Sequence, residues 1–196
     1  MRSIVRVLTV SLLLTCYAAA QAAAPQKKPM GPVTMDRVLN SQLSNVEHEF
    51  VDAADAMPED KYSFAPTEGE FKGVRTFGEQ VRHVAATNYL IGAVMLGDAK
   101  PPADTGEGES GPETIKSKAD IMQYLKASFE YMHKATASVT NEQKFTEMVK
   151  SPFGQGQMPR GSLAVLTVGH CFDHYGQMVE YLRMNGIIPP ASRPRK

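Results

Sequence analysis

The sequence contains little cysteine, carries no excess of either charge and has no apolar run long enough to span a membrane. Its 196 residues include two cysteines and equal numbers of basic and acidic side chains, 21 of each. A nucleic-acid-binding protein needs a basic surface for the phosphates, so the balanced charge argues against that class. We also find no Walker loop, no dinucleotide-binding glycine pattern, no Ser-His-Asp constellation and no convincingly alternating strand.

The first residues are typical of a secretory signal peptide. Arg2 and Arg6 precede the apolar run "VLTVSLLLTCYAAA", and the small residues "AQA" ending at Ala22 fit a cleavage site. The run is shorter than the roughly 18–20 residues that a membrane span needs. We therefore expect export to the periplasm or the medium, with no stable membrane association after cleavage. Lipidation of Cys16 is the alternative, but the threonine before it fits a lipoprotein signal poorly.

Cleavage after residue 22 would leave a chain suited to one domain. The 196 residues less 22 give 174, with 19 basic and 21 acidic side chains. Cys171 is then the only thiol, so no intramolecular disulfide can form and the fold depends on packing. We divide the chain into a signal peptide over 1–22, a flexible lead-in over 23–33, a helical domain over 34–190 and a basic tail over 191–196.

Apolar residues recur at spacings of three and four along four segments, which predicts four amphipathic helices. Thr76 and Glu79 form a capping-box pattern before the second helix, and Ser162 is the expected cap of the fourth. Four helices that each have one apolar stripe favour an all-α four-helix bundle. The predicted helices cover about 34–57, 76–96, 117–139 and 162–185.

The linkers bear on how these helices connect. Residues 97–114 are rich in Gly and Pro, and at about 3.3 Å per extended residue they can cross a helix about 30 Å long. The second and third helices can therefore run in the same direction. The later linker, 141–161, is expected to be mostly irregular.

Three of the five histidines are predicted to face the inside of the bundle. His170 and His174 lie four residues apart on the fourth helix, so both rings point the same way, and His83 lies on the inward stripe of the second helix at a similar depth. They are either core histidines hydrogen-bonded within the protein or ligands of one divalent metal ion with an open position. His48 and His133 lie off the stripes of their helices and are expected at the surface.

Other polar residues are weaker candidates. Asp173, Gln177 and Glu79 could orient an imidazole or take a proton, although Glu79 also completes the capping box. Arg160 would either meet an anionic substrate or be a solvated loop side chain. Cys171 is rotated by about 100° from its histidine neighbour, so it should pack as a small apolar group.

Two stretches resemble the DinB-like (YfiT-like, damage-inducible) family: "FGEQVRHVAATNYLIG" and, further on, "GHCFDHYGQMVEYLRMNGIIPP". The resemblance runs from the first helix through Pro190. It implies a bundle whose helices run up-down-down-up and enclose a divalent metal ion. By this resemblance the ligands are His83, His170 and His174. The family includes metal-dependent hydrolases and transferases of low-molecular-weight thiols.

We therefore expect an exported DinB-like protein that binds one divalent metal ion and acts as a hydrolase through a metal-activated water. Zinc or nickel is the expected ion, with manganese and iron as alternatives. The alternative functions are a non-catalytic periplasmic metal-binding protein and a metal-dependent thiol transferase; export argues against the latter, because thiol cosubstrates are kept reduced in the cytosol. The expected partner is a small-molecule substrate, without nucleic acid, and a homodimer is left open.

Overall fold

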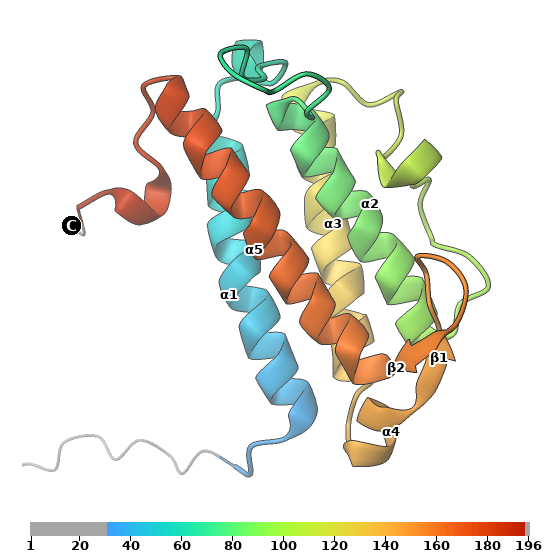
Figure 1. Cartoon of the computed structure of the whole chain (residues 1–196). Helices are drawn as coiled ribbons and strands as arrows, with labels where there is room; N and C mark the ends of the chain where they lie inside the picture. The colour runs from blue at the N-terminus through green and yellow to red at the C-terminus, as the bar shows by residue number, and fades with distance from the viewer. Residues whose placement is uncertain (1–30, 195–196) are drawn as a thin grey trace, which may run out of the picture. The chain divides into compact units, whose positions relative to one another are not determined.

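A computed structural model describes residues 31–194, so the predicted signal peptide and most of the lead-in lie outside the described residues. Contacts divide the chain after Val33, and we describe the unit that begins at Thr34. This unit is predominantly helical, as predicted, with five α-helices and a two-stranded sheet among the described residues (Figure 1). The long helices are α1 (Met35–Ala56), α2 (Phe77–Leu96), α3 (Lys118–Ala137) and α5 (Arg160–Met184).

The ends of α2 follow from its sequence. The Thr76 side chain accepts from the Glu79 N–H, and the Thr76 N–H donates to Glu79 Oε2 over 2.7 Å, which completes the predicted capping box. At the other end Gly97 has φ 79°, a left-handed conformation that ends the helix at little cost for glycine. These two caps fix where α2 begins and ends, and hence the depth of His83 in the fold.

The four long helices share one apolar core. Each contributes side chains spaced three or four residues apart, and burying a residue of this size contributes roughly 1.5–3 kcal/mol. Fully buried examples are Leu43, Val46 and Phe50 from α1, Val81, Val84 and Ile91 from α2, Leu125, Phe129 and Met132 from α3, and Leu163, Met178 and Leu182 from α5.

Contacts along the helices give their relative directions. A Cβ built on Gly78, near the start of α2, would lie 3.5 Å from the Ile121 side chain near the start of α3, and one on Gly92 would lie 2.8 Å from Tyr131 further along α3. The two helices therefore run the same way, and the long connection between them returns the chain past three-residue 3-10 helix η2 (Glu107–Glu109) (Figure 1). Gln80 at the start of α2 bonds Gln177 near the end of α5, and Asn88 further along α2 lies 3.8 Å from Cys171 earlier in α5, so these two helices are antiparallel.

The linker after α3 is more ordered than predicted. It forms the short helix α4 (Glu142–Thr146) and a hairpin of β1 (Met148–Lys150) and β2 (Gln157–Pro159), in which Val149 pairs with Met158. The prediction of an irregular segment was wrong because three-residue strands are too short to show a period.

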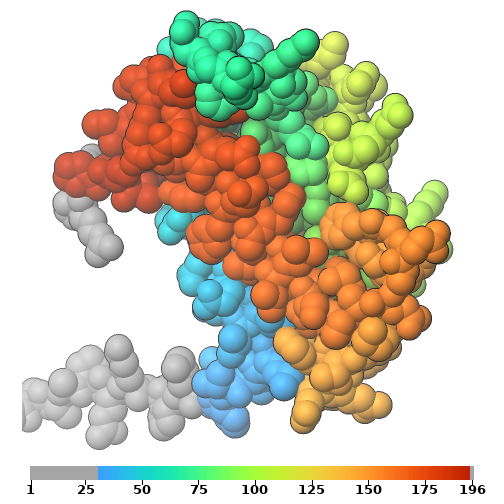
Figure 2. All heavy atoms as spheres, viewed as in Figure 1, coloured from blue at the N-terminus to red at the C-terminus, as the bar shows by residue number. Residues whose placement is uncertain are grey.

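Helix α5 begins earlier than predicted. It starts at Arg160, directly after β2, with Pro159 rather than Ser162 at the capping position. Leu166 of this helix is 41% exposed, because it lies at the edge of the apolar stripe. Figure 2 shows α5 at the surface, between α1 and α2. No helix within the described residues is both long and apolar enough to cross a membrane.

Candidate metal centre

His83 from α2 meets His170 and His174 from α5 inside the fold. The ring centroids lie 5.0 Å apart for His83 and His170, 4.8 Å for His83 and His174, and 4.6 Å for His170 and His174. One nitrogen from each ring lies within 4.8 Å of the other two, so this group could hold a metal ion. The antiparallel pairing of α2 and α5 creates this meeting, because it sets the second turn of α2 against the middle of α5.

Hydrogen bonds fix the tautomers of two of these rings. His83 Nδ1 donates to the main-chain oxygen of Glu109 over 2.8 Å, and His174 Nδ1 donates to Gln80 Oε1. Gln80 Nε2 in turn donates to Gln177 Oε1 over 2.9 Å, which fixes the orientation of the Gln80 amide. Since carbonyl oxygens only accept, each Nδ1 carries the proton and each Nε2 keeps its lone pair.

The surroundings of the third ring, that of His170, indicate whether a metal ion fits between the histidines. His170 Nε2 lies 3.1 Å from His83 Nε2, and the His170 Nδ1 is buried without a hydrogen-bond partner among the described residues. Without an ion, His170 must donate to the lone pair of His83. Three neutral imidazole rings that converge on one point provide ligands that suit zinc, nickel or iron. The residues present therefore fit a divalent metal ion.

The rings are held neutral by their surroundings. Burial, followed by repulsion from His83, lowers the pKa of His170 to about 4. Burial, followed by repulsion from His170 and His83, lowers the pKa of His174 to about 3. Burial also lowers the pKa of His83. Only the neutral ring can bind a metal, so all three are in the binding state at neutral pH.

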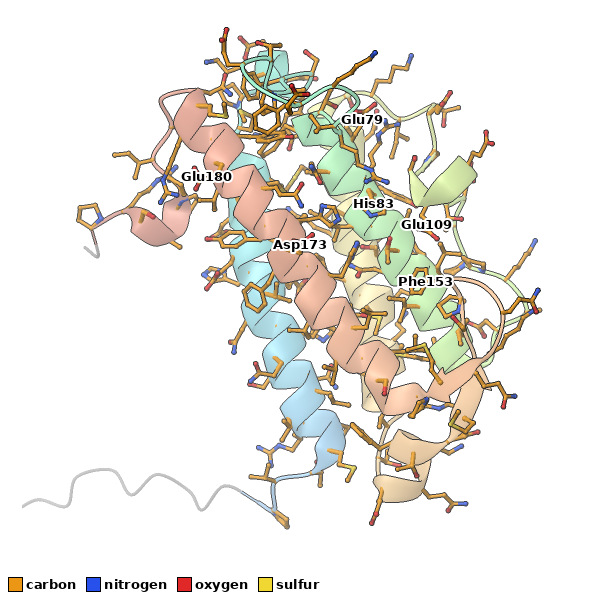
Figure 3. All side chains as sticks on the ribbon, viewed as in Figure 1. Glu79, His83, Glu109, Phe153, Asp173 and Glu180 are labelled. Atoms are coloured by element: carbon orange, nitrogen blue, oxygen red, sulfur yellow. The ribbon has the colours of Figure 1, made fainter. Side chains whose placement is uncertain are left out.

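The weaker candidates lie around this centre (Figure 3). Gln177 reaches it through Gln80, and Asp173 Oδ2 accepts from Gln177 Nε2 over 3.2 Å at the exposed side of α5. The Glu79 carboxylate is occupied by the capping box and lies 3.9 Å from Arg82, which agrees with its structural interpretation. The proton-transfer roles of these residues remain predictions.

Two groups beside the histidines were not predicted. Gln80 lies one turn before His83, a spacing that could have marked it as a partner of the site. Glu109 contributes its main-chain oxygen from η2, and no side-chain pattern in the sequence could reveal a backbone acceptor.

The remaining histidines lie outside the centre. The His48 side chain is 77% exposed, as expected. His133 was expected at the surface, but it is half-buried between α1 and α3, where its Nδ1 lies 2.8 Å from Asn40 Oδ1 and its Nε2 lies 2.8 Å from Glu47 Oε2. The prediction that His133 is exposed was wrong, because a position beside the apolar stripe of α3 can still be covered by the neighbouring helix α1.

Cys171 and Arg160 are both buried. Burial raises the pKa of the Cys171 thiol to about 12, so it packs as an apolar group as expected. Arg160 corresponds to neither of its two interpretations, because it forms an ion pair with Glu147 over 3.0 Å that connects the start of α5 to the residue after α4.

A cleft opens beside the centre. It has a volume of about 590 Å³, and its wall includes Gln80, which is hydrogen-bonded to His174, and Gln177, which is hydrogen-bonded to Gln80. The rest of the wall comes from Gly73, Val74, Arg75, Glu79 and Ser110.

Comparison with solved structures reveals the same fold in other proteins. A DinB-like protein from Bacillus cereus ATCC 10987 is 18% identical, with a TM-score of 0.63 over 80% of this chain and 96% of that one. A DinB-like protein from Bacillus subtilis is 17% identical, with a TM-score of 0.58 over 81% of this chain and 99% of that one. A mycothiol-dependent maleylpyruvate isomerase is 13% identical, with a TM-score of 0.53 over 75% of this chain and 63% of that one.

Sequence comparison gives the family. No curated protein sequence matches the chain significantly. The profile of the DinB superfamily matches residues 42–178, which include all three clustered histidines and well over half of the sequence. The chain therefore belongs to the DinB superfamily.

Proposed function

We propose that this protein binds one divalent metal ion through His83, His170 and His174 and uses it as a hydrolase. The observation that carries the proposal is the convergence of three neutral imidazoles, two of them with Nε2 lone pairs set by fixed hydrogen bonds. Zinc or nickel is the expected ion, with manganese and iron as alternatives. Such an ion would acidify a water molecule and polarise an electrophile.

The residues of the chain would have defined tasks in this reaction. Gln80 and the Glu109 carbonyl hold the rings of His174 and His83 in orientation. Asp173 and Gln177, which bond each other beside the ring of His174, are the nearest candidates to take a proton or orient the attacking group. The buried Cys171 thiol, whose pKa is raised, is unsuited to be a nucleophile.

The wider setting is part of the proposal. We infer that the four long helices are the up-down-down-up bundle implied by the family resemblance, which the shared direction of α2 and α3 supports. The basic, apolar and small-residue order of residues 1–22 supports export. The substrate would be a small molecule that enters the cleft beside the histidines. A homodimer is compatible with this arrangement.

Two alternatives use the same three ligands. A thiol transferase is favoured by the structural likeness to a mycothiol-dependent isomerase, although 13% identity carries only the fold. A metal-binding protein without turnover needs no room for a substrate, so the cleft of about 590 Å³ favours an enzyme over it.

Metal analysis followed by an activity panel tests the proposal. Purified protein should carry about one divalent ion per chain, which His170→Ala or His174→Ala should remove and His83→Ala should strongly weaken. His48→Ala, at an exposed histidine of α1, is the matched control and should keep the ion. A panel of esters, amides and thiol conjugates should then show turnover that chelation abolishes and added metal restores. A metal-free protein with full activity would contradict the proposal.

A further inference from the structure

The cleft beside the histidines contains a cation without a protein partner. Arg75 lines the cleft, and its side chain makes no hydrogen bond or ion pair within residues 31–194; only its main-chain oxygen is engaged, accepting from the Tyr181 hydroxyl over 3.1 Å. The backbone bond holds the main chain of Arg75 in place at the wall of the cleft, and the guanidinium is left available to a ligand.

The other charged group of the wall does not neutralise Arg75. The Glu79 carboxylate accepts from the Thr76 N–H through Oε2 and lies 3.9 Å from Arg82 through Oε1. Its charge is therefore already compensated on the side of α2, and the cleft retains the positive charge of Arg75. Ser110, also in the wall, has a hydroxyl that makes no hydrogen bond among the described residues and can donate one.

The positive charge of Arg75 acts electrostatically on the three histidines. It contributes to lowering the pKa of His83, His170 and His174 alike, after the larger effect of burial. Arg75 therefore lies within electrostatic reach of all three rings, although the cleft wall between them is made by Gln80 and Gln177. A ligand held at Arg75 therefore reaches the centre past the amides of Gln80 and Gln177.

We infer that the cleft selects substrates with a carboxylate group, which Arg75 binds while the reacting end of the molecule lies at the three histidines. A planar guanidinium matches a carboxylate with two parallel hydrogen bonds. One unpaired cation balances a single negative charge, so a carboxylate matches this wall better than a dianion such as a phosphate monoester. This inference rests on the proposed function, since the reacting end needs the metal.

Binding of a matched pair of thiols to the cobalt-loaded protein tests the inference. The probes are 3-mercaptopropionate and its methyl ester, which have the same chain and thiol but differ in charge. Thiolate coordination to Co²⁺ gives a charge-transfer absorption, so affinity is read without any turnover. The variants are Arg75→Gln, Arg75→Lys and the control Lys72→Gln, which removes an exposed cation of the same segment that does not line the cleft.

The wild type and the Lys72→Gln variant should bind the acid about tenfold more tightly than the ester, as expected for a charge-assisted hydrogen bond. Arg75→Gln should remove this preference while keeping the cobalt, and Arg75→Lys should keep part of it. Comparing the ratio between proteins cancels the differing acidity of the two thiols. An acid-to-ester affinity ratio that Arg75→Gln leaves unchanged overturns this inference and leaves the metal site standing. Failure to bind cobalt overturns the proposed function and this inference with it.

Discussion

The Nδ1 atom of His83 lies 2.8 Å from the main-chain oxygen of Glu109, a residue that the sequence places 26 positions away. Glu109 has φ 59° and is the one residue other than glycine with a positive φ in the described part of the chain. A left-handed conformation costs a residue with a Cβ roughly 1–2 kcal/mol. The backbone is therefore strained at Glu109, the residue whose carbonyl group orients the ring of His83.

Substitution of Glu109 should affect metal affinity through the backbone. Glu109→Val should weaken binding by about tenfold, because a branched side chain disfavours positive φ and outer-shell partners of a ligand typically contribute at least this much. Glu109→Gly should keep the affinity, since glycine adopts this φ freely, and Glu109→Gln controls for the lost charge. Competition with a chelating dye gives the affinities. Equal weakening in the glutamine variant would assign the effect to the side chain instead.

Acid should destabilise the metal-free protein through the three histidines. Their folded-state pKa values lie below 6.5, at about 4 for His170 and about 3 for His174. The unfolded chain therefore binds more protons in this window, so stability is fully present above about pH 6.5 and is lost as the pH falls through 4 towards 3. The loss should be on the order of a few kcal/mol.

Urea unfolding in the presence of a chelator at pH 7 and pH 4 measures this effect. His170→Gln and His174→Gln should lose less stability between the two pH values than the wild type, because the titrating ring is gone. His48→Gln, at an exposed position, should lose as much as the wild type. An identical pH dependence in all four proteins would assign the acid sensitivity to the carboxylates rather than to the centre.

The helical framework could be predicted because each long helix shows its period over about twenty residues. The stripe of Leu43, Val46 and Phe50 is buried as expected, and the ends of α2 follow from local caps. The hairpin after α3 could not be predicted in this way, since its strands have three residues each. Its turn depends on Gly154 and Gly156 at positive φ, a signal for a turn but not for strand pairing.

The meeting of the three histidines was predictable from their helix faces and from the family resemblance, but their environment was not. Spacing places His170 and His174 on one side of α5, yet it gives no information on the acceptors Gln80 Oε1 and the Glu109 carbonyl. Those contacts arise from tertiary packing and from a glycine-rich loop. The ion pair of the buried Arg160 with Glu147 could not be predicted either, because it depends on α4, which the sequence did not predict.

The thiol of Cys171 should be inert in the folded protein. It is fully buried, and burial raises its pKa to about 12, so almost no thiolate exists at neutral pH. A thiol reagent such as dithiobisnitrobenzoate should react with it only after denaturation, and Cys171→Ser should keep the metal and most of the activity. Rapid labelling of native protein, or loss of activity with the metal still bound, would redirect the mechanism to covalent thiol chemistry.

Two glycines of α5 should respond in opposite ways to alanine. A Cβ on Gly161 would overlap the ring of Phe145 from α4, whereas one on Gly169 would meet nothing within 4 Å. We expect Gly161→Ala to destabilise the protein by about 1–3 kcal/mol through overpacking. Gly169→Ala, on an exposed helix face, should instead stabilise it by about 0.5–1 kcal/mol, since alanine loses less backbone entropy.

Urea unfolding at neutral pH measures both changes, and a double-mutant cycle isolates the contact. Phe145→Ala removes the ring, so adding Gly161→Ala to that variant should cost much less than in the wild type. The same addition of Gly169→Ala should have an unchanged effect, because it shares no partner with Phe145. A full penalty for Gly161→Ala in the absence of the ring would mean that the backbone of α5, rather than its packing against α4, requires glycine at this position.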